Sequence, residues 1–142
     1  MSIPTILVIE DDAADVFLLR ACLDQLGEEY LLEVLVDGEA ALRFISEHVS
    51  GVRKPEPSVV VLDFYLPRHD GSEVLAAIRQ ESVLKHLKVM VLTSIEFPDD
   101  RVAVERVGAI CRMKPSRLSQ WEDIAADIMA FCKESWSAVV VK

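Results

Sequence analysis

The chain has 142 residues, of which 51% are hydrophobic and 27% are charged, and this length and composition favour one globular domain with a sizeable core. The formal net charge of −9 argues against direct binding to nucleic acid or to an anionic membrane surface, because phosphate contacts need clustered Lys and Arg. No stretch approaches the roughly 20 apolar residues of a membrane span, and acids follow the first apolar run where a secretory leader would continue, so we expect a cytoplasmic protein.

The first half of the chain alternates short apolar runs with segments of helical period. A strand is expected at about 4–10, followed by a helix over Ala13–Leu26 that ends at a glycine. A second strand near 30–36 leads to a helix around Glu39–Glu47. The polar stretch 48–57 contains a glycine and two prolines and is predicted to be a loop.

The second half continues the same alternation. The elements expected there are a strand ending at Asp63, a helix from about Ser72 to Gln80, a strand at about 88–93, a weakly amphipathic helix at roughly 99–107, a strand at about 109–113 and a helix from about Arg117 to Ser135. The final helix has the clearest amphipathic pattern. We therefore expect a domain over 1–135, followed by a short apolar C-terminal tail at 136–142.

The apolar runs identify the fold class. They are continuous and rich in β-branched residues, as in Val59-Val60-Val61-Leu62, which is typical of strands buried on both faces of a parallel sheet. Strands that alternate with helices predict an α/β fold. We expect a doubly wound five-stranded parallel sheet in the flavodoxin-like order 2-1-3-4-5, with helices on both faces. Ligands bind such sheets at the carboxyl ends of the strands.

Polar groups follow the expected strands at that same edge. Glu10 and Asp11 follow the first strand and Asp63 ends the third, and these strands are neighbours in the expected order. Three carboxylates so close together repel one another unless a cation shares the site. Mg²⁺ is the natural choice, because it prefers oxygen ligands and also grips phosphate.

Thr93 and Lys114 complete a set of groups suited to phosphoryl transfer. With the metal neutralising charge, one carboxylate can attack a phosphoryl group, while an ammonium and a hydroxyl bind its remaining oxygens. Lys114 and Thr93 supply these two groups at the ends of the fifth and fourth strands. The chemistry needs little beyond positioning and charge stabilisation.

The chain resembles the receiver domains of bacterial two-component response regulators, the CheY-like proteins. The matching segments are Ile6-Leu7-Val8-Ile9-Glu10-Asp11-Asp12, the stretch from Val60 through Asp63 to Gly71, Val91-Leu92-Thr93-Ser94 and Met113-Lys114-Pro115. The spacing agrees, since Pro67 lies 4, Gly71 8 and Thr93 30 residues after Asp63. The turn Leu66-Pro67-Arg68 and the segment 84–87 look most like stand-alone regulators that accompany phytochrome-type histidine kinases.

The resemblance implies a role for each matching residue. Asp63 would be the phosphoacceptor, Glu10 and Asp11 the acidic pair for Mg²⁺, and the backbone carbonyl of Tyr65 a further metal ligand. Thr93 would be the switch hydroxyl and Lys114 would hold the phosphoryl group. The implied partners are a sensor histidine kinase and a downstream protein or phosphotransfer partner. A symmetric homodimer through the fourth helix, fifth strand and final helix, tightened by phosphorylation, is a further hypothesis.

The chain departs from the family pattern at three positions. Cys111 stands where most receivers carry a switch Tyr or Phe, which puts the aromatic part of the switch in doubt. Tyr65 and Ile95 each lie two residues after a site residue. We expect these two side chains to shield an acyl phosphate from water and to make its loss slow.

Simpler explanations apply to several residues. Asp12 suits a helix N-terminus. We expect His48, His69 and His86 to be solvated surface residues, not phosphodonors. Trp121 and Trp136 are expected to pack, and the three cysteines, Cys22, Cys111 and Cys132, to be reduced, partly buried thiols.

Two other functions are open to such a chain. A phosphatase of the haloacid dehalogenase type also uses an aspartyl nucleophile with Mg²⁺, but it needs a second Asp at the position of Tyr65. A pseudo-receiver would bind partners without phosphorylation, and its mark would be the loss of an acid, the Lys or the Thr. None of these is missing here. The receiver is therefore the favoured interpretation.

Overall fold

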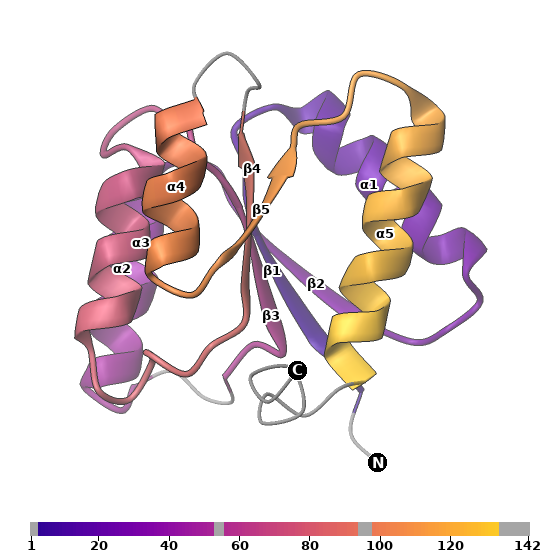
Figure 1. Cartoon of the computed structure of the whole chain (residues 1–142). Coiled ribbons are helices and arrows are strands. Elements are labelled where there is room, and N and C mark those ends of the chain that lie inside the picture. The colour runs from indigo at the N-terminus through magenta and orange to yellow at the C-terminus, as the bar shows by residue number, and fades with distance from the viewer. Residues whose placement is uncertain (1–2, 53–55, 94–97, 134–142) are drawn as a thin grey trace.

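The computed structural model describes residues 3–52, 56–93 and 98–133, in which five strands alternate with five helices (Figure 1). The elements are β1 (Thr5–Ile9), α1 (Ala13–Gln25), β2 (Leu31–Leu35), α2 (Gly38–Val49), β3 (Val59–Asp63), α3 (Gly71–Gln80), β4 (Val89–Thr93), α4 (Pro98–Arg106), β5 (Ile110–Met113) and α5 (Leu118–Lys133). All neighbouring strands pair in parallel, and the strand order is β2-β1-β3-β4-β5. The predicted fold class and strand order are therefore confirmed.

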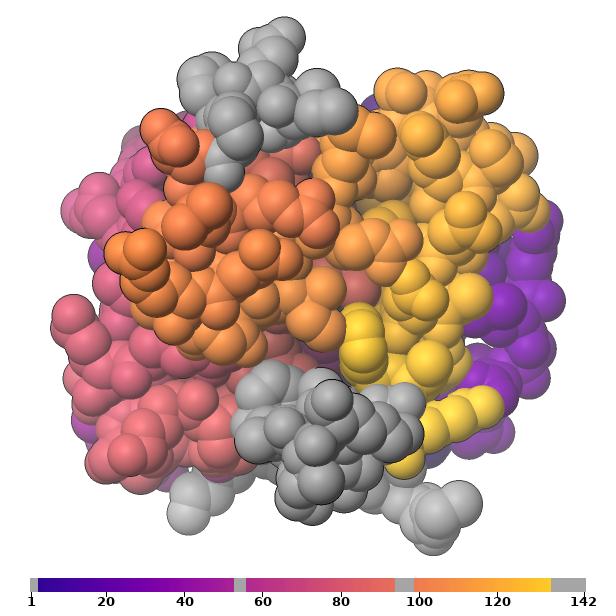
Figure 2. Space-filling model, in the orientation of Figure 1, coloured from indigo at the N-terminus to yellow at the C-terminus, as the bar shows by residue number. Residues whose placement is uncertain are grey.

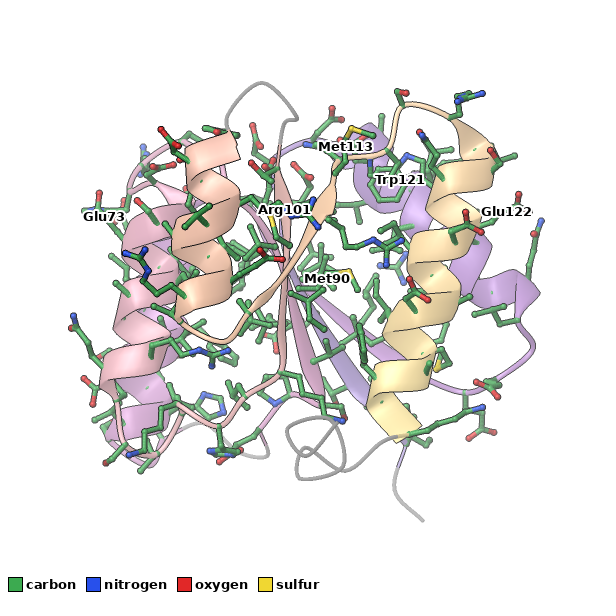
Figure 3. The ribbon with its side chains drawn as sticks, in the orientation of Figure 1. Glu73, Met90, Arg101, Met113, Trp121 and Glu122 are labelled. Carbon is green, nitrogen blue, oxygen red and sulfur yellow. The ribbon has the colours of Figure 1, made fainter. Side chains whose placement is uncertain are left out.

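Helices cover the sheet on both faces. Figure 1 shows α2, α3 and α4 on one side and α1 and α5 on the other. Each side has its own cluster of buried apolar residues, one around Leu62 and Val91 and the other around Val61 and Trp121. Figure 3 shows the Trp121 side chain extending from α5 towards the sheet, and Met90 in the same layer. Because alternate residues of a strand serve opposite faces, β3 and β4 need the continuous apolar runs seen in the sequence.

Three aspartates begin helices on this scaffold. The side chain of Asp12 accepts hydrogen bonds from the backbone N–H groups of Ala14 and Asp15 at the start of α1. The Asp37 side chain accepts from the N–H of Ala40 at the start of α2, and that of Asp70 accepts from the N–H of the adjacent Gly71 at the start of α3. These caps satisfy backbone donors that have no partner within a helix. The capping role expected for Asp12 is confirmed.

The prediction for His48 is wrong. Helix α2 continues through His48 to Val49, past the expected end at Glu47, and only then reaches the turn at Gly51. The His48 side chain is buried, and its ring lies against that of Phe44 with the centroids 4.4 Å apart. His48 therefore belongs to the packed face of α2, whereas the side chains of His69 and His86 are about half exposed.

The remaining packing predictions agree with the structure wherever their residues are described. Trp121 is buried, and the three cysteines are free, with Cys22 and Cys111 buried and Cys132 partly so, as expected. Ile95, Trp136 and the tail at 136–142 lie outside the described residues, so the predictions made for them stay predictions. Within the described ranges, no helix is long and apolar enough to cross a membrane.

Candidate functional site

The site lies at the carboxyl edge of the sheet, which is the upper edge in Figure 1. Glu10 directly follows β1, Asp63 and Thr93 end β3 and β4, and Lys114 directly follows β5. The strand register brings these ends level, because Ile9 pairs with Leu62 and Asp63 pairs with Leu92. Thr93 in turn pairs with Met113. Four separate parts of the sequence thus supply polar side chains to one place.

Three carboxylates converge at this edge. One oxygen each from Glu10, Asp11 and Asp63 lies within 4.8 Å of the others. Glu10 and Asp63 are each 4% exposed, and Asp11 is exposed. Burial, together with the neighbouring Asp63 carboxylate, raises the pKa of Glu10 to about 8. An oxygen-rich cluster that is open on one side and has unfavourable charge repulsion suits a hard divalent cation such as Mg²⁺.

Lys114 is the cation that balances this cluster among the described residues. Its Nζ atom lies 2.9 Å from Asp63 Oδ2, 3.0 Å from Glu10 Oε1 and 3.1 Å from Asp15 Oδ2. Burial alone would lower the pKa of Lys114, but hydrogen bonds to Asp63 and Glu10 outweigh it and raise the pKa above the ordinary value. The ammonium is therefore charged at neutral pH and is held against the carboxylate of Asp63.

Asp15 is the member of this arrangement that the sequence did not reveal. It stands in the first turn of α1, five residues after Glu10. An acid in a first helical turn is ordinarily explained by the helix dipole, so its presence gave no separate signal. Its contact with Lys114 depends on how α1 lies against the end of β5.

Thr93 presents a buried hydroxyl at the end of β4. Its Oγ1 atom makes no hydrogen bond of ordinary geometry within the described chain, although the Tyr65 hydroxyl interacts with it. Such an atom ordinarily costs stability unless a ligand or water satisfies it. Thr93 lines an open pocket together with Asp63, Tyr65 and Lys114. A phosphoryl oxygen in this pocket could accept a hydrogen bond from the Thr93 hydroxyl.

The loop after Asp63 is held close to the site. The backbone N–H of Tyr65 donates to Asp63 Oδ1 at 3.1 Å, and the Tyr65 hydroxyl donates to Asp100 at the start of α4. Gly71 is needed where the loop returns, because a Cβ there would lie 2.6 Å from the Phe64 Cα atom. The Tyr65 side chain is 42% exposed and borders the pocket over Asp63.

Cys111 is 2% exposed in β5, and burial raises the pKa of its thiol, so the thiol stays protonated. Among the described residues, Tyr65 is an aromatic residue that links the site to α4, through Asp100.

The comparisons with known proteins identify the class. Residues 6–120 match the sequence profile of the response regulator receiver domain, and the chain belongs to that family. Receiver domains are the response elements of two-component systems, and the family contains signalling proteins.

Within this class the chain is similar to regulators of phytochromes. It is 37% identical over 112 residues to the response regulator Rcp1 of Synechocystis sp., which covers 79% of this chain and 76% of Rcp1. The crystal structure of the Mn²⁺-bound form of Rcp1 superposes with a TM-score of 0.80 at 32% identity, over 93% of this chain and 96% of the other.

A second solved structure gives the same placement. The phosphorylated cyanobacterial phytochrome response regulator RcpA has a TM-score of 0.80 at 27% identity, over 92% of this chain and 94% of that one. The resemblance to phytochrome-type regulators that the sequence indicated is therefore confirmed.

Proposed function

We propose that this receiver domain accepts a phosphoryl group on Asp63 from the phosphohistidine of a sensor kinase and signals through contacts with other proteins. One observation carries the proposal: the Lys114 ammonium lies 2.9 Å from the Asp63 carboxylate, in a pocket that the buried Thr93 also lines, beside the acids Glu10 and Asp11. Each of the groups that aspartyl phosphorylation needs is present, and all of them border one pocket or contact one another.

Each site residue has its own role in the phosphoryl transfer. An oxygen of Asp63 attacks the phosphorus atom, the P–N bond to the kinase histidine breaks, and the imidazole leaves with the bond's electron pair and takes up a proton. Lys114 binds one phosphoryl oxygen and Thr93 donates to another. Glu10, Asp11 and Asp63 would hold Mg²⁺, with the backbone carbonyl of Tyr65 as a further ligand. When bound, the metal neutralises the carboxylates and the incoming phosphoryl oxygens.

Two relatives support the proposal that this chain binds a divalent cation and is phosphorylated. Rcp1 has a Mn²⁺-bound form and RcpA a phosphorylated one. Because both resemble this chain over more than nine tenths of its length, a phytochrome-type histidine kinase is the partner we propose. The phosphatase alternative is disfavoured by Tyr65, and the pseudo-receiver alternative by the presence of Glu10, Asp11, Thr93 and Lys114.

The experiment that tests the proposal is phosphorylation with acetyl phosphate. With Mg²⁺ the chain should gain one phosphoryl group that is stable to acid and labile to hydroxylamine. Asp63→Asn should abolish its formation, whereas Asp70→Asn, which keeps a capping side chain on the neighbouring loop, should not. Phosphoryl incorporation that survives Asp63→Asn would overturn the proposal.

The output surface we propose is the face formed by α4, β5 and α5, which Figure 2 shows. Each of these elements has an exposed apolar side chain: Val102 in α4, Met113 at the end of β5 and Leu118 at the start of α5. The face adjoins Thr93 and Lys114 through β4 and β5, so phosphorylation would be felt there first. We propose that it binds a downstream protein, a phosphotransfer partner or a second copy of the chain. Sedimentation of the chain at tens of micromolar, with and without phosphodonor, distinguishes the two cases. A dimer supports a second copy of the chain, and a monomer under both conditions leaves a heterologous partner.

A further inference from the structure

Asp15 lies beside the site without being part of its metal cluster. Its side chain is 18% exposed, and its Oδ2 atom is 3.1 Å from Lys114 Nζ. The carboxylates that can converge on one cation are those of Glu10, Asp11 and Asp63, and Asp15 is not among them. Its partner within the site is therefore Lys114.

The start of α1 leaves Asp15 available for this contact. Asp15 is the third residue of the helix, where an acid often reaches back to the N–H of the capping residue. Here the N–H of the capping residue, Asp12, donates instead to Glu10 Oε2 at 3.1 Å. The Asp12 side chain satisfies the N–H groups of Ala14 and Asp15. The helix start is thus capped without the Asp15 carboxylate.

Lys114 has three N–H donors and three carboxylate partners, which are Asp63, Glu10 and Asp15. Two of these partners, Glu10 and Asp63, are candidate metal ligands, and phosphorylation would also change the acceptor oxygen on Asp63. A cation bound to Glu10 and Asp63 would compete with the ammonium for their oxygens. Asp15 is the one of the three partners that is neither a candidate metal ligand nor the proposed phosphoacceptor.

We propose that Asp15 is a positioning residue that holds the Lys114 ammonium in place for phosphoryl transfer, an inference that rests on the proposed function. The lysine side chain has four rotatable bonds, and ordering it has an entropic cost. By pairing with the ammonium, Asp15 orders the Lys114 side chain before the phosphodonor binds. Asp15 is itself held in place, because it extends from the capped first turn of a helix. Its own carboxylate does not touch the reacting atoms.

The test compares Asp15→Asn with Asp12→Asn, alone and in a Lys114→Met background. Asp12→Asn removes the same charge from the same helical turn and keeps a residue that caps well, and Asp12 does not contact Lys114. Two quantities are measured with Mg²⁺ present: the rate of phosphorylation by acetyl phosphate, and the affinity for beryllofluoride, a stable mimic of the phosphoryl group. Denaturant unfolding confirms that each variant is folded.

With Lys114 in place, Asp15→Asn should slow phosphorylation and weaken beryllofluoride binding by about three- to tenfold, and Asp12→Asn should change neither by more than about twofold. In the Lys114→Met background, beryllofluoride binding should no longer respond to Asp15→Asn. Equal effects of the two aspartate variants, or an effect of Asp15→Asn that persists without Lys114, would overturn the inference. A chain that never gains phosphate on Asp63 would instead overturn the proposed function.

Discussion

Replacing Lys114 by Met should destabilise the metal-free protein strongly. The change leaves the carboxylates of Glu10 and Asp63, whose side chains are 4% and 5% exposed, without their ammonium partner. Removing one member of a buried ion pair costs about 3–5 kcal/mol. Because the Lys114 side chain is 30% exposed and water can take part of its place, we expect a loss of about 2–4 kcal/mol at about pH 9, above the pKa of about 8 of Glu10.

Urea unfolding with and without Mg²⁺ measures this loss. With an m value of about 2 kcal/mol/M, a loss of 3 kcal/mol lowers the midpoint by about 1.5 M. Magnesium at about twenty times its Kd should add about 1.8 kcal/mol to the wild type. It should add more to Lys114→Met, since no ammonium competes for the carboxylates. Tenfold tighter binding would add about 1.4 kcal/mol beyond the wild-type gain.

Lys133→Met is the matched control. Lys133 pairs with Glu28 at the surface, where its side chain is 63% exposed, so its loss should cost under about 1 kcal/mol and should not alter the response to Mg²⁺. If Lys114→Met were as stable as the control variant, or if Mg²⁺ stabilised both variants equally, the assignment of Lys114 as the cation that balances the metal cluster would be refuted.

Three further predictions concern protonation, phosphate lifetime and packing. Because burial raises the pKa of Glu10 to about 8, Mg²⁺ must displace a proton from Glu10 at lower pH, so calorimetry should show weaker binding and more proton release at about pH 7 than at about pH 9; pH-independent binding would contradict this. Tyr65→Asn should speed loss of phosphate from the purified protein, whereas Tyr65→Phe, which keeps the ring but not the hydrogen bond to Asp100, should not. If Tyr65→Asn lost phosphate at the wild-type rate, the Tyr65 ring would not shield the acyl phosphate. His48→Ala should lower the free energy of unfolding by about 2–3 kcal/mol through lost packing against Phe44, yet leave phosphorylation intact, and loss of phosphorylation in a folded variant would revive His48 as a functional residue.

The sequence predicted the fold and most of the site for a definite physical reason. Strands such as Val59–Asp63 and Val89–Thr93 are buried on both faces, so they appear as continuous apolar runs whose last residues mark the functional edge. Parallel pairing then places Asp63 beside β1 and Thr93 beside β5 without further information. The family resemblance supplied a role for each of these residues.

What the sequence did not predict depends on how helices lie against the sheet. The contact of Asp15 with Lys114 spans 99 positions, and that of Tyr65 with Asp100 joins a loop to a helix 35 residues away. Neither has a local signature, since both acids also fit the first turn of a helix. The prediction for His48 was wrong because the loop inferred from the glycine and prolines at 51–57 was expected to begin at residue 48. It therefore included the last two residues of α2.

The most direct test of the account is to locate the phosphoryl group. After incubation with acetyl phosphate, borohydride reduction converts an aspartyl phosphate to homoserine, which peptide mass spectrometry can place in the sequence. We expect homoserine at position 63 when Mg²⁺ is present and unmodified Asp63 when a chelator has removed the metal. Modification at any other residue, or equal modification of Asp63 with and without Mg²⁺, would contradict the assignment of Asp63, Lys114 and the acidic cluster to one phosphorylation site.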